Sequence, residues 1–247
     1  MSYVAAIREV SSVPGVLRIG IFASISLLFS IFGRLVRGVT GGGAIAGAAV
    51  CFLLLWAAEG RGFLALVTVF LLTWLSTRAG YARKQGLGTA EASSGRNALQ
   101  VVANLGTAAA CAALYTQVGS PRVFLAMAAA LAEPAADTVA SEIGQAVGGA
   151  PRMITSWRNA KPGANGAISA MGTAAGAAAA LAVALVFCAW GGPGGFSVVV
   201  IAFSAIAGMI ADSVLGATLE GPRRLGNNAV NFLSTLLAAV LAFLIAG

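Results

Sequence analysis

Residues 195–218 read GFSVVVIAFSAIAGMIADSVLGAT, an apolar run in which Asp212 is the only charged side chain. A helix needs roughly 20 apolar residues to cross a bilayer, and this run is long enough. The whole chain has the same character, since 59% of its 247 residues are hydrophobic and 9% are charged. A soluble domain carries about 25% charged residues, so the composition excludes an ordinary soluble enzyme. We predict a single transmembrane domain over residues 1–247.

Eight apolar segments of this kind follow one another along the chain. They cover residues 19–33, 39–58, 62–77, 98–117, 123–141, 166–190, 195–218 and 229–246. Small residues recur at four-residue spacing, as at Gly172, Gly176, Ala180 and Ala184, and they let helix backbones pack closely in lipid. The predicted fold is an all-α polytopic membrane protein, a bundle of about eight transmembrane helices whose matching motifs point to internal repeats.

The Lys and Arg residues predict the orientation of the bundle. With eight spans, four of the 15 basic residues lie on one side of the membrane, namely Arg8, Arg18, Arg61 and Arg122. The other 11 share the opposite side: Arg34, Arg37, Arg78, Arg83, Lys84, Arg96, Arg152, Arg158, Lys161, Arg223 and Arg224. The basic side faces the cytoplasm by the positive-inside rule. We therefore expect a protein of the bacterial inner membrane with both termini outside the cytoplasm.

Two residue counts exclude several kinds of chemistry. The chain has no histidine, which excludes Ser-His-Asp catalysis, His-ligated zinc and histidine proton relays. The three cysteines, Cys51, Cys111 and Cys188, lie in separate apolar segments without metal-binding spacing. They are interpreted as small packing residues.

Acidic side chains within the spans are the first functional candidates. Glu133, Asp137 and Glu142 lie in or beside the fifth span, and Asp212 lies in the seventh. An ionisable group in hydrocarbon costs at least about 2.5–3.5 kcal/mol, so such groups usually mark a site. The structural alternative is an acid that caps a neighbouring helix or pairs with an arginine. The two aspartates have matching surroundings, Ala136-Asp137-Thr138-Val139 and Ala211-Asp212-Ser213-Val214.

A second motif recurs at the cytoplasmic starts of three spans. Its copies read Gly95-Arg96-Asn97-Ala98, Gly163-Ala164-Asn165-Gly166 and Gly226-Asn227-Asn228-Ala229. Asparagine is a favoured helix N-cap, so plain capping would explain one copy. The free N–H groups of a helix start also bind phosphate well, and glycine lets a ligand approach the backbone. Three copies beside basic residues, facing two aspartates, favour phosphate binding.

These features together predict a Mg²⁺–polyphosphate site at the cytoplasmic membrane surface. Mg²⁺ is typically held by one or two carboxylates together with water and phosphate oxygens, which suits Asp137 and Asp212. Phosphoryl transfer depends on positioning and charge neutralisation, so it tolerates a chain without histidine. The basic residues next to the motifs are the candidates for neutralising phosphate charge: Arg96, Arg152, Arg158 and Lys161.

The motifs resemble, in the same order over residues 38–235, those of an integral membrane family that includes the plant phytyl-phosphate kinase and the animal transmembrane protein 19. The resemblance rests on Leu75–Arg78 with Arg83-Lys84, Gly95–Asn104, Asp137–Gly144, Pro151–Thr155, Gly163–Ser169, Asp212–Thr218 and Asn227–Leu233. It implies a kinase that uses CTP or another nucleoside triphosphate to convert a prenyl monophosphate lipid into its diphosphate. It also implies a distant tie to dolichol kinases.

The resulting hypothesis assigns a role to each candidate residue. Catalysis is assigned to Asp137, Asp212, Arg96 and Lys161, and Mg²⁺ binding to the two aspartates assisted by Glu142 or Glu133. Nucleotide and phosphate binding is assigned to Asn97, Arg152, Arg158, Gly163, Asn165, Gly166, Asn227 and Asn228. Membrane lipids are expected partners and nucleic acid is not. The alternatives are a nucleotidyltransferase acting on a lipid phosphate and a secondary transporter, whose site would lie near the midplane.

Overall fold

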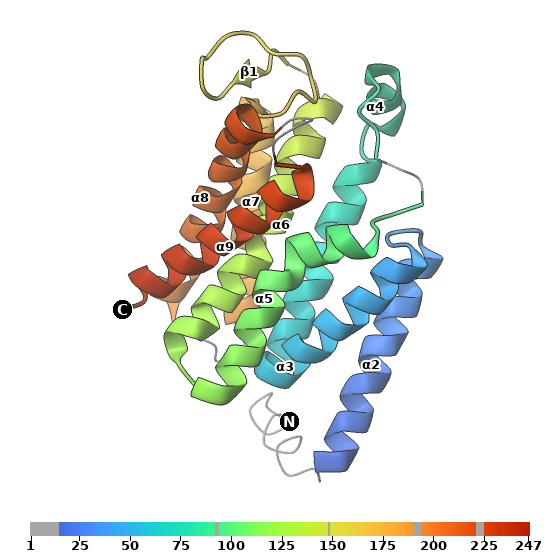
Figure 1. Cartoon of the computed structure of the whole chain (residues 1–247), viewed down its shortest axis with the longest axis vertical. Coiled ribbons are helices and arrows are strands. Elements are labelled where there is room, and N and C mark those ends of the chain that lie inside the picture. The colour runs from blue at the N-terminus through green and yellow to red at the C-terminus, as the bar shows by residue number, and fades with distance from the viewer. Residues whose placement is uncertain (1–14, 92–93, 148, 190–193, 221–224) are drawn as a thin grey trace.

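The structure is a computed structural model that describes residues 15–91, 94–147, 149–189, 194–220 and 225–247. Its elements in chain order are α2 (Gly15–Leu35), α3 (Gly41–Arg78), α4 (Tyr81–Leu87), α5 (Ala98–Val118), α6 (Pro121–Val147), β1 (Arg152–Met153), β2 (Ala167–Ile168), α7 (Ala170–Cys188), α8 (Gly195–Leu219) and α9 (Asn227–Ile245). Seven helices in the described residues are long and apolar enough to cross a membrane. The predicted all-α polytopic membrane fold is confirmed (Figure 1).

Helix α3 makes two passes through the bundle. Its backbone leaves the helical region at Glu59, where φ is 52° and ψ is −136°. Figure 1 shows one arm running away from the α2–α3 connection and the other returning beside it. The side chain of Arg78, at the end of the second arm, donates to the Val36 carbonyl at 2.8 Å. The spans predicted over 39–58 and 62–77 are therefore the two arms of one broken helix, so the described residues make eight passes.

An ion pair stabilises this reversal. The Arg18 guanidinium of α2 binds the Glu59 carboxylate with an N–O distance of 3.1 Å. Arg18 also lies over the rings of Phe22 and Trp56, at 5.2 and 5.0 Å from their centroids. Positive φ is unusual for a residue other than glycine and has to be held by its surroundings. The bound arginine supplies that constraint where the chain turns.

Helix α6 is the centre of the bundle. Almost every side chain from Val123 to Ala136 is buried, and α3, α5, α7, α8 and α9 all pack against it. A Cβ at Gly172 of α7 would collide with the Ala140 carbonyl, and one at Gly176 would lie 2.6 Å from the Ala136 carbonyl. The packing stripe predicted on α7 is confirmed, because its small residues are buried against α6.

The end of the bundle that carries α4 and the β1–β2 hairpin holds the longest connections (Figure 1). The two short strands pair antiparallel, with Arg152 opposite Ile168 and Met153 opposite Ala167. The sixth span, predicted to begin near residue 166, begins slightly later in the structure. Strand β2 occupies residues 167–168, and α7 begins at Ala170 after Ser169, whose hydroxyl accepts from Gly172 N–H at 3.1 Å.

We expect single cysteines to report the predicted orientation. In a variant whose three native cysteines are replaced by alanine, Ala90→Cys should resist a membrane-impermeant maleimide in intact spheroplasts and react after lysis. The matched variant Ser120→Cys, in the α5–α6 turn at the opposite end, should react in intact spheroplasts. The charge distribution is the physical reason. Labelling of residue 90 from the outside would reverse the orientation.

Candidate functional site

Asp137 of α6 and Asp212 of α8 lie on the wall of one cavity of about 510 Å³. We call it the aspartate cavity. It opens at the end of the bundle that carries the β-hairpin, and its wall includes Arg83, Ser141, Gly163, Asn165, Gly166, Thr173, Ser213, Glu220 and Asn227. The cavity is within the range of small-molecule sites. Two carboxylates separated in sequence thus meet beside a glycine- and asparagine-bearing loop.

Hydrogen bonds and close packing fix the carboxylates. The Ser234 hydroxyl of α9 donates to Asp212 Oδ2 at 3.1 Å. Glu133 lies one helical turn before Asp137 and is 1% exposed, and a Cβ at Gly208 would lie 2.7 Å from its Cγ. Glu133 Oε1 has no hydrogen-bond partner among the described residues. A third acid is therefore buried below the cavity, but it does not line it.

Arg96 approaches the aspartates from the segment before α5. Its Nη2 donates to Thr138 Oγ1 at 3.1 Å, and Thr138 is the neighbour of Asp137 in the chain. The positive charge of Arg96 acts on the Asp137 carboxylate, but the two are not within ion-pair distance. Arg83, at the exposed face of α4, lines the cavity directly. Sequence reasoning used Arg83 for topology and for the family resemblance, but did not select it for the site.

The loop between the strands follows the wall of the cavity. Gly163 and Gly166 have φ of +78° and +75°, which favours glycine. A Cβ at Gly166 would lie 2.6 Å from the Ser213 carbonyl of α8, so the loop backbone lies directly on the helix that carries Asp212. Burial raises the pKa of Glu220 at the end of α8, and a hydrogen bond with Asn165 opposes that rise.

The three G-x-N motifs do not share one structural role. Asn97 caps α5, which was the alternative to phosphate binding: it accepts from Gln100 N–H at 3.0 Å while the Gln100 side chain accepts from Asn97 N–H at 2.8 Å. Asn165 lies within the loop, and Ser169 caps α7 instead. Gly226 is the N-cap of α9, with Asn227 and Asn228 in its first turn. The three copies therefore do not share a capping role, and of the four motif asparagines only Asn165 and Asn227 line the cavity.

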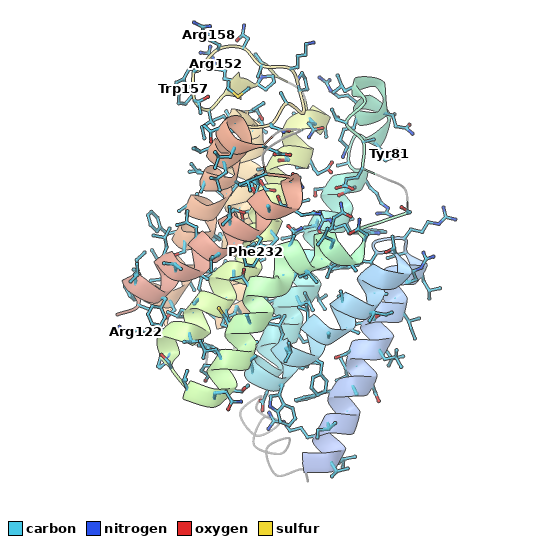
Figure 2. All side chains as sticks on the ribbon, in the orientation of Figure 1. Tyr81, Arg122, Arg152, Trp157, Arg158 and Phe232 are labelled. Carbon is cyan, nitrogen blue, oxygen red and sulfur yellow. The ribbon has the colours of Figure 1, made fainter. Side chains whose placement is uncertain are left out.

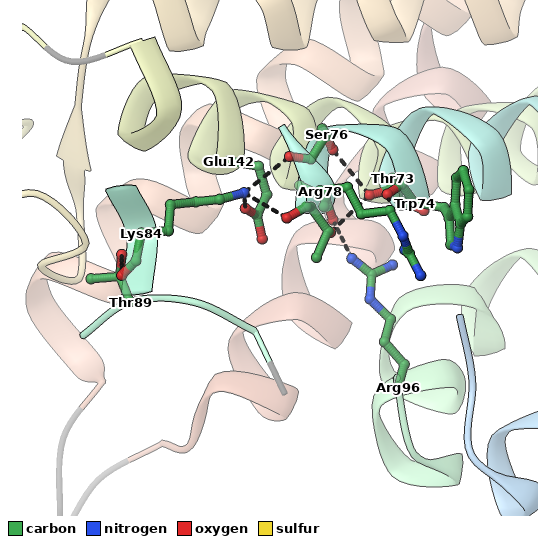
Figure 3. A network of polar contacts seen from close by, with 10 residues as sticks. Thr73, Trp74, Ser76, Arg78, Lys84, Thr89, Arg96 and Glu142 are labelled. Carbon is green, nitrogen blue, oxygen red and sulfur yellow. Dashed lines mark hydrogen bonds and ion pairs between the residues drawn. The ribbon is translucent and has the colours of Figure 1, made fainter. Parts of the chain in front are cut away.

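Glu142 pairs with a lysine instead of joining the aspartates. The Lys84 ammonium of α4 is fully buried and binds the Glu142 carboxylate. It also donates to the carbonyls of Ser76 and Thr77 at 3.0 and 2.7 Å (Figure 3). All three ammonium hydrogens thus have acceptors. Glu142 does not line the aspartate cavity, so its predicted assistance to the metal is not supported by this geometry.

Three of the predicted basic residues lie outside the cavity wall. Arg152, Arg158 and Lys161 are exposed in the segment 149–169. Figure 2 shows Arg152 and Arg158 at the outer edge of this segment beside Trp157. Trp157 is 64% exposed and also lines the cavity. These cations can attract an anionic ligand to the cavity through long-range charge, but they do not line it.

Sequence reasoning missed a polar network behind the cavity. Asn231 of α9 donates to Asn104 of α5 at 3.3 Å, and Thr107 bonds to Thr235 at 3.0 Å. Polar side chains at three- or four-residue spacing share a helix face. That signal is present in both helices and could have indicated a shared polar seam.

Two aspartates with phosphate oxygens match a common way of holding Mg²⁺. Within the described ranges, no group of three or more acidic or cysteine side chains is close enough to hold a metal by itself. Below the aspartates, the buried Glu133 Oε1 remains without a hydrogen-bond partner within the described ranges. The residues therefore fit Mg²⁺ that arrives with a phosphate ligand, and they do not form an all-protein metal cage.

Gly166→Ala tests the close contact between loop and helix. A Cβ there would collide with the α8 backbone and would also be strained by the positive φ. We expect a lower thermal unfolding midpoint, measured in detergent. The control Gly119→Ala has a similar positive φ of +62° and lies outside the cavity wall, and its Cβ would meet nothing within 4 Å. Equal effects of both substitutions would contradict the proposed contact.

The fold and cavity define a polytopic helical membrane protein with an acid-lined site at one end of its bundle. Residues 24–239 match the model of the integral membrane protein family DUF92, and the chain belongs to that family. It is 36% identical to an uncharacterized membrane protein of Synechocystis over 199 residues, covering 77% of this chain and 76% of the relative. No solved structure matches.

Two further relatives extend the comparison to plants and archaea. The chain is 33% identical to the chloroplastic protein VTE6 of Arabidopsis thaliana over 235 residues, covering 89% of this chain and 69% of the relative. It is 26% identical to an uncharacterized membrane protein of Methanocaldococcus jannaschii over 248 residues, covering 96% of this chain and 98% of the relative. The similarity therefore covers nearly the whole bundle.

Proposed function

We propose that this protein is a membrane prenyl-phosphate kinase that transfers a phosphoryl group from CTP, or another nucleoside triphosphate, to an isoprenoid monophosphate. The observation that carries the proposal is the aspartate cavity, where Asp137 and Asp212 share a wall with Asn165 and Asn227. The motif resemblance to the family of the plant phytyl-phosphate kinase supports the same reaction, and the chain is 33% identical to the plant protein VTE6.

In the proposed reaction the aspartate cavity holds the donor nucleotide. The loop around Gly163 and Gly166 presents backbone close to the ligand, and Asn165 and Asn227 donate to phosphate oxygens. An oxygen of the acceptor phosphate attacks the terminal phosphorus of the donor. A new P–O bond forms, the bond to the bridging oxygen breaks, and that oxygen leaves with the nucleoside diphosphate. Arg96 neutralises charge between acceptor and donor.

No general base is needed for this transfer. A phosphate monoester carries about −1.5 to −2 charges at pH 7, so the attacking oxygen is already an anion. Phosphoryl transfer relies mainly on positioning and electrostatic stabilisation, which this chain without histidine provides. Asp137 and Asp212 would hold Mg²⁺, which when bound supplies charge neutralisation at the donor phosphates.

The opening of the aspartate cavity at one end of the bundle favours an enzyme over a transporter. Asp212 lies about 10 Å along the helix axis from the end of α8 at Leu219, and Asp137 lies about 15 Å from the end of α6 at Val147. Transporter sites lie near the bilayer midplane, about 15 Å from either surface of a 30 Å core. The aspartate cavity opens at one end of the bundle, which we place at the cytoplasmic face, where nucleotides are available.

The test is an assay of the purified protein in liposomes with geranylgeranyl monophosphate, CTP labelled on its terminal phosphate, and Mg²⁺. The expected products are CDP and a labelled prenyl diphosphate. Release of pyrophosphate with a nucleotidyl lipid would indicate the alternative nucleotidyltransferase. Substrate uptake without nucleotide consumption would indicate a transporter and contradict the proposal.

A further inference from the structure

A second cavity lies on the α2–α3 side of the bundle. It has a volume of about 360 Å³ and is bounded by α2, α3, α5 and Pro134 of α6. Arg37, Arg78 and Arg96 all line it, and we call it the arginine cavity. Arg96 is the link between the two cavities, because its side chain binds Thr138 beside Asp137.

The arginine cavity is a long slot parallel to the helices. Its wall on the second arm of α3 repeats every three or four residues, the spacing of one helix face: Leu66, Val69, Phe70, Thr73, Trp74, Thr77 and Arg78. From Leu66 to Arg78 this face extends about 18 Å along the helix. The part remote from the arginines is apolar, with Phe29, Leu66 and Leu105 on its wall. Its shape and lining suit one flexible hydrocarbon chain.

The charges of the slot gather at one end. Arg37 follows α2, Arg78 ends α3 and Arg96 precedes α5, so all three lie at the end of the bundle where the aspartate cavity opens. Figure 3 shows the side chains of Arg78 and Arg96 reaching toward each other. Arg78 also lies over the Trp74 ring, at 4.0 Å from its centroid. Among the described residues, none of the three arginines is within ion-pair distance of a carboxylate, and Glu91 is the one acid on the wall.

We propose that the arginine cavity binds the lipid acceptor, a phosphate monoester on a single apolar chain. The guanidinium groups of Arg37 and Arg78 bind the phosphate, since arginine matches phosphate oxygens in charge and in geometry. The chain lies along the slot toward Leu66 and Leu105. Arg96 then holds the acceptor phosphate next to the aspartate cavity. This inference rests on the proposed kinase function for the identity of the acceptor.

Gly47 offers a way to fill the slot without damaging the helix. It lies on the wall, and a Cβ added there would meet nothing within 4 Å. Leucine is also a better helix former than glycine. Gly20 of α2 is the matched control, because its added Cβ would equally meet nothing and it is exposed outside the slot. Arg34 is the matched control for Arg37, one turn away and outside the cavity wall.

The experiment measures binding of radiolabelled geranylgeranyl monophosphate to the full chain in nanodiscs without nucleotide. Arg37→Gln and Arg78→Gln should each weaken binding about tenfold, the loss expected for one charge-assisted hydrogen bond. Arg34→Gln should leave it unchanged. Gly47→Leu should weaken binding at least as much as the Arg37 and Arg78 substitutions do, whereas Gly20→Leu should leave binding unchanged. Competition by dimethylallyl monophosphate, which is too short to reach Gly47, should be the same in wild type and Gly47→Leu.

Because nucleotide is absent, the result is independent of whether transfer occurs. Failure of the kinase assay with these binding losses intact would overturn the proposed function and keep the lipid site. Undiminished binding in Gly47→Leu and both arginine variants would overturn the lipid site, even if the kinase assay succeeds.

Competition by other lipids tests the chemistry of the ligand. Phosphatidic acid competing as well as geranylgeranyl monophosphate would overturn the single-chain assignment. Geranylgeraniol competing equally would overturn the role of the arginines. Size-exclusion profiles show whether each variant is folded, and Gly47→Ala repeats the test with a smaller side chain.

Discussion

Asp137→Asn is expected to lower the turnover of diphosphate formation by about 10²–10³-fold, the loss typical of removing one electrostatic stabiliser from a transition state. Asp212→Asn should have an effect of similar size, because both aspartates line the same cavity. Each substitution keeps the shape of the side chain and removes the negative charge that would bind Mg²⁺. The measurement is steady-state production of prenyl diphosphate in liposomes, repeated over a range of Mg²⁺ concentrations.

The folded state should survive both changes. An amide in a half-buried, membrane-embedded position is less costly than an unpaired carboxylate, so the thermal unfolding midpoint should stay the same or rise. Ser141→Ala is a suitable control, since Ser141 also lines the cavity but carries no charge. Full activity of Asp137→Asn, or activity that does not depend on Mg²⁺, would show that the site assignment is wrong.

Lys84→Met is expected to cause the largest loss of stability, about 3–5 kcal/mol, as for other buried pairs that lose one partner. The substitution would leave the Glu142 carboxylate and the Thr77 carbonyl without the lysine donor. The Ser76 carbonyl would lose one of its donors and keep the Ala79 N–H. The free energy of unfolding can be followed by denaturant titration in detergent. The double variant Lys84→Met/Glu142→Gln should recover part of the loss, because it removes the unpaired charge. Lys161→Met, at an exposed position, should be nearly neutral.

A loss below about 1 kcal/mol for Lys84→Met would place this pair among weak surface ion pairs. That outcome would contradict the burial of Lys84, which the structure gives as complete. If Lys84→Met causes the expected loss of stability, the Lys84–Glu142 ion pair is a structural connection between α4 and α6. It would then hold Arg83 of α4 at the wall of the aspartate cavity.

The helical passes could be predicted from sequence because lipid imposes one simple rule. Every backbone polar group must be satisfied within the membrane, so apolar runs of sufficient length become helices. Even the pair 39–58 and 62–77 was separable, since Glu59 and Arg61 interrupt the apolar pattern. The β-hairpin was missed because each strand is only two residues long, too short for an alternating pattern to be visible.

Part of the candidate site could also be predicted from local sequence. An acid in an apolar helix stands out, which singled out Asp137 and Asp212. Pairings between distant residues leave no such local trace, and Lys84 and Glu142 are 58 residues apart. Glu142 looked like a partner of Asp137 by proximity in sequence, but its side chain is turned to α4. Asn165 matched the capping motif by composition, yet the strand after it delays the start of α7 to Ala170.

The convergence of arginines on one cavity also could not be predicted from sequence. In the sequence, membrane orientation explains Arg37 and also Arg78, which the family resemblance includes as well, and neither was assigned a site role. Their convergence on one slot depends on the return of the second arm of α3 alongside α2, where Phe29 packs edge-on against Phe63 and Phe70. Helix packing of this kind is set by side-chain fit over many contacts, which no short motif encodes.

The turn at Glu59 also affects how the chain is inserted into the bilayer during its synthesis. In the predicted orientation, Arg18 and Glu59 must both be translocated, and each charge alone would cost about 2.5–3.5 kcal/mol at the membrane centre. Bound to each other, as they are in the folded protein, they present a nearly neutral pair to the lipid. Residues 15–78 would therefore insert into the bilayer as one unit, with α2 remaining next to the translocon until both arms of α3 have been synthesised.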